Sequence, residues 1–268
     1  MARPRLYSDQ PLADGEQVTL DGDRARYAGR VLRCRRGDEL VLFDGRGGEF
    51  PAVVREIDKQ SVRLELGDRL GRETESPLPV RLIQGISRGD RMDTVVQKAT
   101  ELGVQRISPL LAGFSVVRLA GERAQSRRRH WQRVAASACE QCGRNRLPQV
   151  DAPAALADCL AERVAADTLR LVLVPQATPA LAAIAQTPAA LELLIGPEGG
   201  FSDAEQAQAV AAASRPWASV PGCCAPRRRR SPRSRWCSRA GATCDADQGV
   251  SPLIICCELR GRESAGIR

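Results

Sequence analysis

The feature that most constrains the fold of this sequence is a pair of apolar runs, Leu169–Val174 and Leu191–Ile195, each the length of one strand. Near-continuous apolar runs are typical of strands buried on both faces of a parallel sheet. The second run leads directly into Ile195–Ser202, which reads IGPEGGFS, and a helix is expected to begin at Ser202 or Asp203. In open parallel sheets, ligands bind beyond the carboxyl ends of the strands. This glycine turn is therefore the first candidate for a functional site.

Strands and helices are expected to alternate from residue 80 to residue 213. Besides the two apolar runs, the periodicity predicts strands at Val80–Ile86 and Val104–Leu111, and helices at Met92–Leu102, Arg123–Cys142, 180–186 and 203–213. Gly103 follows the first of these helices, where a glycine commonly ends a helix. Strands that alternate with helices predict an α/β domain with a parallel sheet.

The first 70 residues have a different pattern. Leu40–Phe43 is an apolar run that ends at the turn signal Asp44-Gly45, and Val62–Leu66 alternates with period two. Short strands with turns between them predict a small β-barrel over residues 1–70. Residues 71–79, GRETESPLP, are charged and contain two prolines, so they are expected to form a linker.

The positive charge of the chain is unevenly distributed. The formal net charge is +8, but residues 214–268 contain 11 Arg and 4 acidic residues, which leaves residues 1–213 almost neutral. Six of the ten cysteines also lie after residue 214. The sequence contains no apolar run long enough to cross a membrane and no apolar export signal near Met1, so a cytoplasmic location is expected. The character of the chain changes near residue 214.

Taken alone, the glycine turn is either an ordinary strand-to-helix turn or a ligand site. The turn lacks the Lys-Ser/Thr of a phosphate-binding loop and the glycine spacing of a dinucleotide fingerprint. The pair Cys139 and Cys142 supplies only two of the four ligands of a structural zinc site, so no metal is expected. His130, the single histidine, has no clear partners for a hydrolytic triad.

Arginines concentrate at two places outside the tail, at residues 24–36 and along the expected helix at residues 123–133. A single run of charge usually marks a solvated face. Two clusters, together with Arg144 and Arg146 in a nearly neutral body, instead favour a localised surface for RNA.

A resemblance to a known family rests on six blocks in family order: Gly29–Arg33, Leu42–Gly45, Gln84–Met92, Gln97–Val104, Ala138–Arg146 and Ile195–Ser202. Together they closely resemble the RsmE family of the SPOUT superfamily, whose members methylate N3 of a uridine, U1498, in 16S ribosomal RNA. The match covers roughly residues 3–213. It implies a PUA-like β-barrel, followed by a SPOUT-type α/β domain with a parallel sheet and a C-terminal trefoil knot.

The resemblance also implies S-adenosylmethionine as methyl donor, 16S ribosomal RNA or the 30S subunit as partner, and a homodimer if the C-terminus is intact. The residues expected to bind the donor are Val174, Pro175, Gln176, Ile195, Gly196, Pro197, Glu198, Gly199 and Gly200. The residues expected to contact RNA are Arg5, Arg30, Arg33, Arg91, Asn145 and Arg146.

Methylation at N3 requires that N3 loses its proton, and a nearby cation would favour the resulting anion. Arg88, Lys98 and Arg144 are the candidates for this catalytic role. The alternative is that Lys98 is a solvent-facing helix residue and Arg88 a turn residue at the end of a strand. The sequence leaves both interpretations open.

The last part of the chain departs from the family pattern, which has a second donor loop similar to L-G-P-x-x-L-R-T-E-T-A. This chain instead reads Val220–Pro226 (VPGCCAP) followed by four arginines. For a suitable choice of codons for Pro216–Arg229, triplets that start one nucleotide earlier encode L-G-L-G-P-G-L-L-R-T-E-T-A. We therefore interpret residues from about 214 as frameshifted, so that the knot is incomplete; the alternative is a natural RNA-binding tail.

The expected organisation is a β-barrel at residues 1–70, a linker at 71–79, a methyltransferase domain at 80–213 and an aberrant, disordered tail at 214–268. The leading functional interpretation is an RNA (uracil-N3)-methyltransferase. The alternative is a non-catalytic RNA- or ribosome-binding protein that has lost its donor site through the altered C-terminus.

Overall fold

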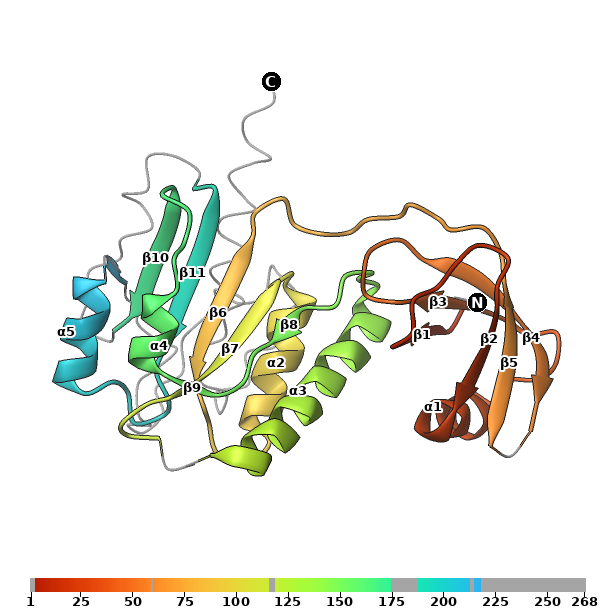
Figure 1. Cartoon of the computed structure of the whole chain (residues 1–268), viewed down its shortest axis with the longest axis horizontal. Coiled ribbons are helices and arrows are strands. Elements are labelled where there is room, and N and C mark those ends of the chain that lie inside the picture. The colour runs from red at the N-terminus through yellow and green to blue at the C-terminus, as the bar shows by residue number, and fades with distance from the viewer. Residues whose placement is uncertain (1–2, 59, 116–118, 175–187, 213–214, 218–268) are drawn as a thin grey trace, which may run out of the picture.

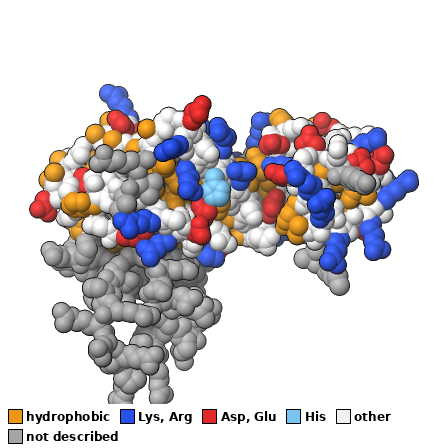
Figure 2. Space-filling model, turned by 90° about the horizontal axis from the view of Figure 1, so that it is seen from below, with side chains coloured by type: hydrophobic (Ala, Val, Ile, Leu, Met, Phe, Trp, Pro, Cys, Tyr) orange, Lys and Arg blue, Asp and Glu red, His pale blue; other side chains and the backbone are white. Residues whose placement is uncertain are grey.

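The computed structural model of the chain describes residues 3–58, 60–115, 119–174, 188–212 and 215–217. Two sheets organise these residues, one formed within residues 5–66 and the other within residues 80–217 (Figure 1). In the space-filling view they form two lobes (Figure 2). The predicted helix at 180–186 lies outside the described residues, as does the predicted disordered tail at 214–268 except for residues 215–217.

The N-terminal lobe contains a five-stranded sheet in the order β1-β3-β4-β5-β2. Its elements are β1 (Arg5–Tyr7), β2 (Gln17–Asp21), α1 (Gly22–Arg26), the π-helical turn η1 (Tyr27–Val31), β3 (Glu39–Phe43), β4 (Phe50–Ile57) and β5 (Ser61–Leu66). Val62, Leu64 and Leu66 of β5 are buried, as the period of two predicts. Among the described residues no pairing joins β1 to β2, so the predicted small barrel is a curled half-barrel.

The second sheet is parallel throughout, in the order β12-β10-β11-β6-β7-β8, with β9 beside β7. Its strands are β6 (Val80–Gly85), β7 (Arg106–Leu111), β8 (Gln149–Val150), β9 (Ala154–Ala155), β10 (Thr168–Leu173), β11 (Ala190–Ile195) and β12 (Arg215–Trp217). The helices are α2 (Arg91–Glu101), α3 (Gly121–Cys142), α4 (Leu156–Ala161) and α5 (Asp203–Ala211). The predicted parallel α/β architecture is confirmed, and the sheet continues past the predicted boundary at residue 213 because β12 pairs with β10.

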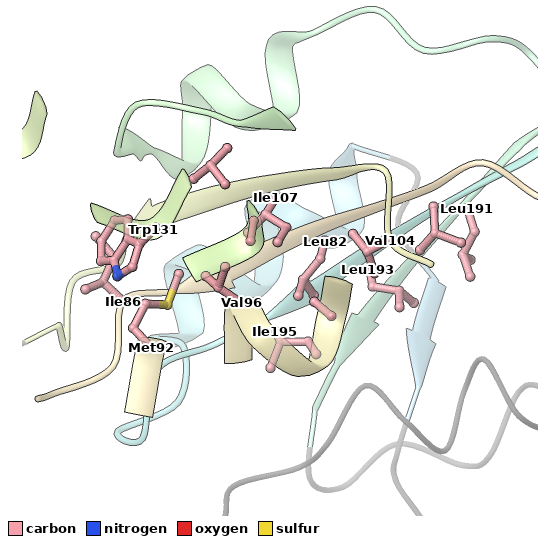
Figure 3. Close-up of a cluster of buried hydrophobic side chains, with 14 of the residues drawn as sticks. Leu82, Ile86, Met92, Val96, Val104, Ile107, Trp131, Leu191, Leu193 and Ile195 are labelled. Carbon is pink, nitrogen blue, oxygen red and sulfur yellow. The ribbon is translucent and has the colours of Figure 1, made fainter. Parts of the chain in front are cut away.

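Helices cover both faces of the parallel sheet. Successive strand residues point to opposite faces, so a continuous apolar run places apolar side chains on both of them. On one face α2 and α3 pack against Leu82, Ile107 and Leu193, and Figure 3 shows this cluster with Met92, Val96 and Trp131 of the two helices. On the other face α4 and α5 pack against Ile83, Leu110 and Leu194. Strands covered on both faces account for the continuous apolar runs in the sequence.

A buried ion cluster crosses three neighbouring strands near their amino ends. Glu192 of β11 lies in register between Arg81 of β6 and Arg170 of β10. Its carboxylate accepts hydrogen bonds from Arg81 Nη1 at 2.9 Å and from Arg170 Nε at 2.6 Å. All three side chains are at most 12% exposed. Glu192 therefore compensates two buried positive charges at once.

The segment at residues 71–79, predicted to be a linker, is held against the parallel domain by Arg144. This guanidinium donates from Nε and Nη2 to the carboxylate of Glu75, at 3.0 and 2.6 Å. It also donates from Nη1 to the carbonyl oxygens of Thr100 and Val104, at 2.7 and 2.9 Å. The Arg144 side chain is only 5% exposed.

Candidate functional site

The glycine turn lies at the carboxyl end of β11, inside the parallel sheet, with β10 on one side and β6 on the other. Within the turn, the Gly200 amide donates to the Pro197 carbonyl oxygen at 2.8 Å, and Gly200 has a φ of 74°, which favours glycine. The helix α5 begins immediately afterwards with a capping box between Ser202 and Glu205. The turn is thus held between β11 and the capped start of α5. It lies at the edge of the sheet where parallel folds bind ligands.

The end of β6 approaches this turn so closely that residue 85 has no room for a side chain. A Cβ atom at Gly85 would lie 2.3 Å from the Pro197 nitrogen and 2.7 Å from the Gly196 carbonyl carbon. The buried Gln84 side chain donates from Nε2 to the Gly85 oxygen at 3.0 Å and to the Gly196 oxygen at 3.4 Å. The position of the turn is therefore fixed by main-chain packing against β6.

Replacing Gly85 by alanine is expected to displace the turn, because the added methyl group meets backbone atoms that cannot rotate away. We expect a loss of about 1–3 kcal/mol in the free energy of unfolding, typical of overpacking. Amide hydrogen exchange at Gly196–Gly200 should become faster. The control is Gly71→Ala, because nothing lies within 4 Å of the added Cβ there. Equal exchange in the two variants would contradict the proposed packing.

Glu198 connects the turn to the loop that follows β6. Its Oε1 atom accepts hydrogen bonds from the Arg88 amide at 3.2 Å and from Arg91 Nη1 at 3.2 Å. Burial alone would raise the pKa of Glu198, but hydrogen bonds from its own amide, the Arg88 amide and Arg91 together lower that pKa. Glu198 is therefore a carboxylate at neutral pH, and it orients the start of α2.

The loop that follows β7 borders the turn on another side. The Gly113 amide donates to Glu205 Oε1 at 2.7 Å, which ties this loop to the first turn of α5. A Cβ atom at Gly199 would lie 3.2 Å from Cβ of Phe114, whose side chain is 56% exposed. Three loops, after β6, β7 and β11, therefore meet at one edge of the sheet.

The residues predicted to bind the donor lie on this edge as far as they are described. Ile195 ends β11, Gly196–Gly200 form the turn, and Val174 follows β10, the neighbouring strand. Pro175 and Gln176 lie outside the described residues.

The three catalytic candidates lie in different places. Arg88 is exposed beside the glycine turn. Lys98 lies in the second half of α2, paired with Glu101 at 2.9 Å and away from the strand ends. Arg144 contacts Thr100 and Val104, which precede β7, so it lies at the opposite end of the sheet and its guanidinium is engaged. Neither Lys98 nor Arg144 contacts the turn of its own chain, and their catalytic role stays a prediction.

The residues predicted to contact RNA fall into two groups, one engaged in internal contacts and one exposed. Arg5 donates to the side chain of Asn145 at 2.5 Å and pairs with Glu49, and Asn145 is fully buried and donates to the Arg72 oxygen. These contacts join the half-barrel to the parallel domain, and the predicted RNA contacts of Arg5 and Asn145 stay predictions.

Arg146 pairs with Glu73 at 3.2 Å, and Arg91 pairs with Glu198. Both arginine side chains remain more than half exposed. Arg30 and Arg33 are exposed on the half-barrel, without an ion pair to any described residue.

Sequence reasoning did not identify Gln84, Gly85, Phe114 or Glu205 as parts of the site. Ser202 and Glu205 have the spacing of a capping box, which could have been recognised. The roles of Gly85 and Phe114 depend on contacts between segments far apart in the sequence, and no local pattern encodes them.

The comparisons with known proteins agree with this geometry. A family model described as an RNA methyltransferase domain matches residues 74–217, and one described as an RNA methyltransferase PUA domain matches residues 20–67. The ribosomal RNA small subunit methyltransferase E of Mycobacterium bovis is 32% identical over 206 residues, which are 75% of this chain and 78% of that protein. The chain belongs to the ribosomal RNA small subunit methyltransferase E family. The predicted resemblance to the RsmE family is thereby confirmed.

Two solved structures are similar to the chain over both lobes. A ribosomal RNA small subunit methyltransferase E of Neisseria gonorrhoeae, bound to S-adenosyl methionine, is 35% identical with a TM-score of 0.76, over 82% of this chain and 89% of that one. A putative methyltransferase of Legionella pneumophila, in complex with SAM, is 33% identical with a TM-score of 0.78, over 82% of this chain and 90% of that one. The predicted PUA-like and SPOUT-type architecture of the RsmE family is confirmed.

Among the described residues, no group of three or more His, Cys, Asp or Glu side chains could hold a metal ion. None of the helices in this part of the chain is long and apolar enough to span a bilayer.

Proposed function

We propose that this RsmE-family chain transfers a methyl group from S-adenosylmethionine to N3 of a uridine, U1498, in the 16S ribosomal RNA of the 30S subunit. The observation that carries the proposal is the turn Gly196–Gly200, which is packed against β6 at the carboxyl end of β11. The similar structures with bound S-adenosylmethionine support this donor. The reaction would take place in the cytoplasm, where ribosomes are assembled.

The residues present fit a donor that is held mainly by main-chain groups. Gly199 is exposed and Gly200 half-buried, so the turn offers backbone atoms without covering side chains. Val174, which follows β10, would form the adjacent wall. When bound, S-adenosylmethionine supplies an electrophilic methyl group, and the protein supplies its position and orientation.

We assign to Arg88 the role of favouring the loss of the uridine N3 proton. It is exposed beside the turn, and its backbone is fixed by Glu198. A guanidinium close to N3 would stabilise the anion that forms when the N3 proton leaves, because opposite charges lower the pKa of the acid. Arg91 is engaged by Glu198, so its role would be to orient this loop.

We infer four parts for the chain: an RNA-contacting half-barrel at residues 1–70, the linker at 71–79, a methyltransferase domain from residue 80 to about residue 217, and an aberrant tail. The family model ends its match at residue 217, close to where the composition changes. A frameshift there would remove the second donor loop, the closure of the trefoil knot and part of the homodimer face.

Methyl transfer to RNA tests this proposal. A repaired chain, in which the residues from Trp217 onward are replaced by the sequence that the gene encodes one nucleotide earlier, should label 16S ribosomal RNA or 30S subunits from labelled donor. The chain as given should label them weakly or not at all. If the repaired chain binds the RNA but labels neither form, the alternative of a non-catalytic ribosome-binding protein replaces the proposal.

A further inference from the structure

The exposed side of α3 carries a group of arginines without counter-charges. Arg123, Arg127, Arg129 and Arg133 are all exposed, and none forms an ion pair or side-chain hydrogen bond with any described residue. With 3.6 residues per turn, Arg129 and Arg133 point away from the buried Ala124, Trp131 and Ala135, and Arg123 and Arg127 lie on one flank of α3. We call these four residues the arginine face.

Most other arginines near the core of this protein are compensated. Arg81 and Arg170 share Glu192, and Arg144 is paired with Glu75. On the neighbouring helix α2, Asp93 is already in use: its carboxylate accepts a hydrogen bond from Trp131 Nε1 at 3.1 Å and lies 2.7 Å from His130 Nε2. The charge of the arginine face is thus available to an anionic partner.

The position of α3 connects the two parts of the proposed enzyme. The helix begins after β7, at the end of the sheet that carries the glycine turn, and its other end reaches the half-barrel (Figure 1). There Glu140 Oε1 accepts a hydrogen bond from the Tyr7 amide of β1 at 2.9 Å. A helix of 22 residues spans about 33 Å. In the view of Figure 2, Lys and Arg side chains lie on both sides of the single histidine, His130, with acidic side chains directly below it, and further Lys and Arg side chains lie on the other lobe.

We propose that the arginine face binds the phosphodiester backbone of RNA and guides it from the half-barrel to the glycine turn. This inference rests on the proposed function, because it supplies a docking surface for the RNA substrate. Phosphate contacts position a nucleic acid without reading its sequence, and arginine provides bidentate donors for them. Arg5 and Asn145, by contrast, make contacts that join the two lobes.

Two other occupants fit less well. A membrane-binding helix needs apolar side chains beside its cations, and none of the large exposed hydrophobic residues in the described part of the chain lies on α3. A second copy of the chain related by twofold symmetry would bring like charges together, which disfavours self-association through this face.

Quantitative RNA binding tests the proposal. We compare the chain with Arg123→Gln/Arg127→Gln/Arg129→Gln/Arg133→Gln, using a 16S ribosomal RNA transcript without donor at several salt concentrations. Four lost phosphate contacts would reduce the slope of log affinity against log salt by about 3, and the affinity should fall at least about tenfold at moderate salt. Glutamine is a good helix former, so α3 should be preserved, which circular dichroism checks.

The matched control removes the same charge from the tail, as Arg227→Gln/Arg228→Gln/Arg229→Gln/Arg230→Gln. The proposal predicts that this variant loses less than half as much in salt slope. Equal losses in the two variants would indicate a net-charge effect and overturn it, as would a loss confined to the tail variant. Stronger binding to phosphatidylglycerol vesicles than to RNA would also overturn it. If the repaired chain binds RNA through the arginine face but transfers no methyl group, the proposed function fails while the docking surface stands.

Discussion

Replacing Glu192 by alanine is expected to lower the free energy of unfolding by about 3–5 kcal/mol, the usual cost of breaking a buried ion pair from one side. The reason is that Arg81 and Arg170 both lose their shared carboxylate while they remain buried. Arg81 keeps a hydrogen bond to Ser108 and a salt bridge to Glu162, which limits the loss.

Urea unfolding followed by tryptophan fluorescence measures this effect, since all three tryptophans (131, 217 and 236) come after residue 70 in the sequence. The control is Glu65→Ala, which removes the partner of Arg55 in an exposed pair on the half-barrel. Its unfolding midpoint should hardly change, because exposed pairs contribute little. If Glu192→Ala unfolded at the same urea concentration as Glu65→Ala, the ion cluster would not have the structural role that we assign to it.

Repairing the C-terminus is expected to have the largest effect on ligand binding. The chain as given contains the loop after β11 but not the second donor loop of the family, so we expect it to bind S-adenosylmethionine weakly or not at all. The repaired chain should bind at least about a hundredfold more tightly, which corresponds to about 2.7 kcal/mol of binding free energy. Calorimetry on the two chains measures the difference.

Two results would contradict this account of the C-terminus. Micromolar donor affinity in the chain as given would show that the second loop is dispensable. An in-frame genomic read around codons 210–220 that reproduces the present tail would exclude the frameshift. In that case the natural RNA-binding tail becomes the better explanation of its 11 arginines.

The sequence predicted the parallel domain well because burial on both faces leaves a strong local signal. The runs at Leu169–Val174 and Leu191–Ile195 correspond to β10 and β11 to within one residue. The half-barrel was also predictable from the period-two alternation of Val62–Leu66. The glycine turn was found because glycine between a strand and a helix is a local pattern.

What sequence alone could not provide was the pairing of distant side chains. By residue type, Arg144 could be a catalytic or an RNA-binding residue. In the fold its positive charge is balanced by the carboxylate of Glu75, 69 positions earlier in the chain. The role of Gly85 depends on Pro197, which joins it only in the folded sheet. Charge and residue type predict that an arginine binds an anion, whereas the fold decides whether that anion is internal or external.

Hydrogen exchange with and without donor tests the central claim, that Gly196–Gly200 form the methyl-donor loop. In the repaired chain, saturating S-adenosylmethionine should slow amide exchange at Ile195–Phe201 and at the end of β10 near Val174. The half-barrel strands β3 to β5 should be unaffected and serve as the internal control. The account predicts protection centred on the glycine turn. Tight donor binding that leaves this turn unprotected would contradict it.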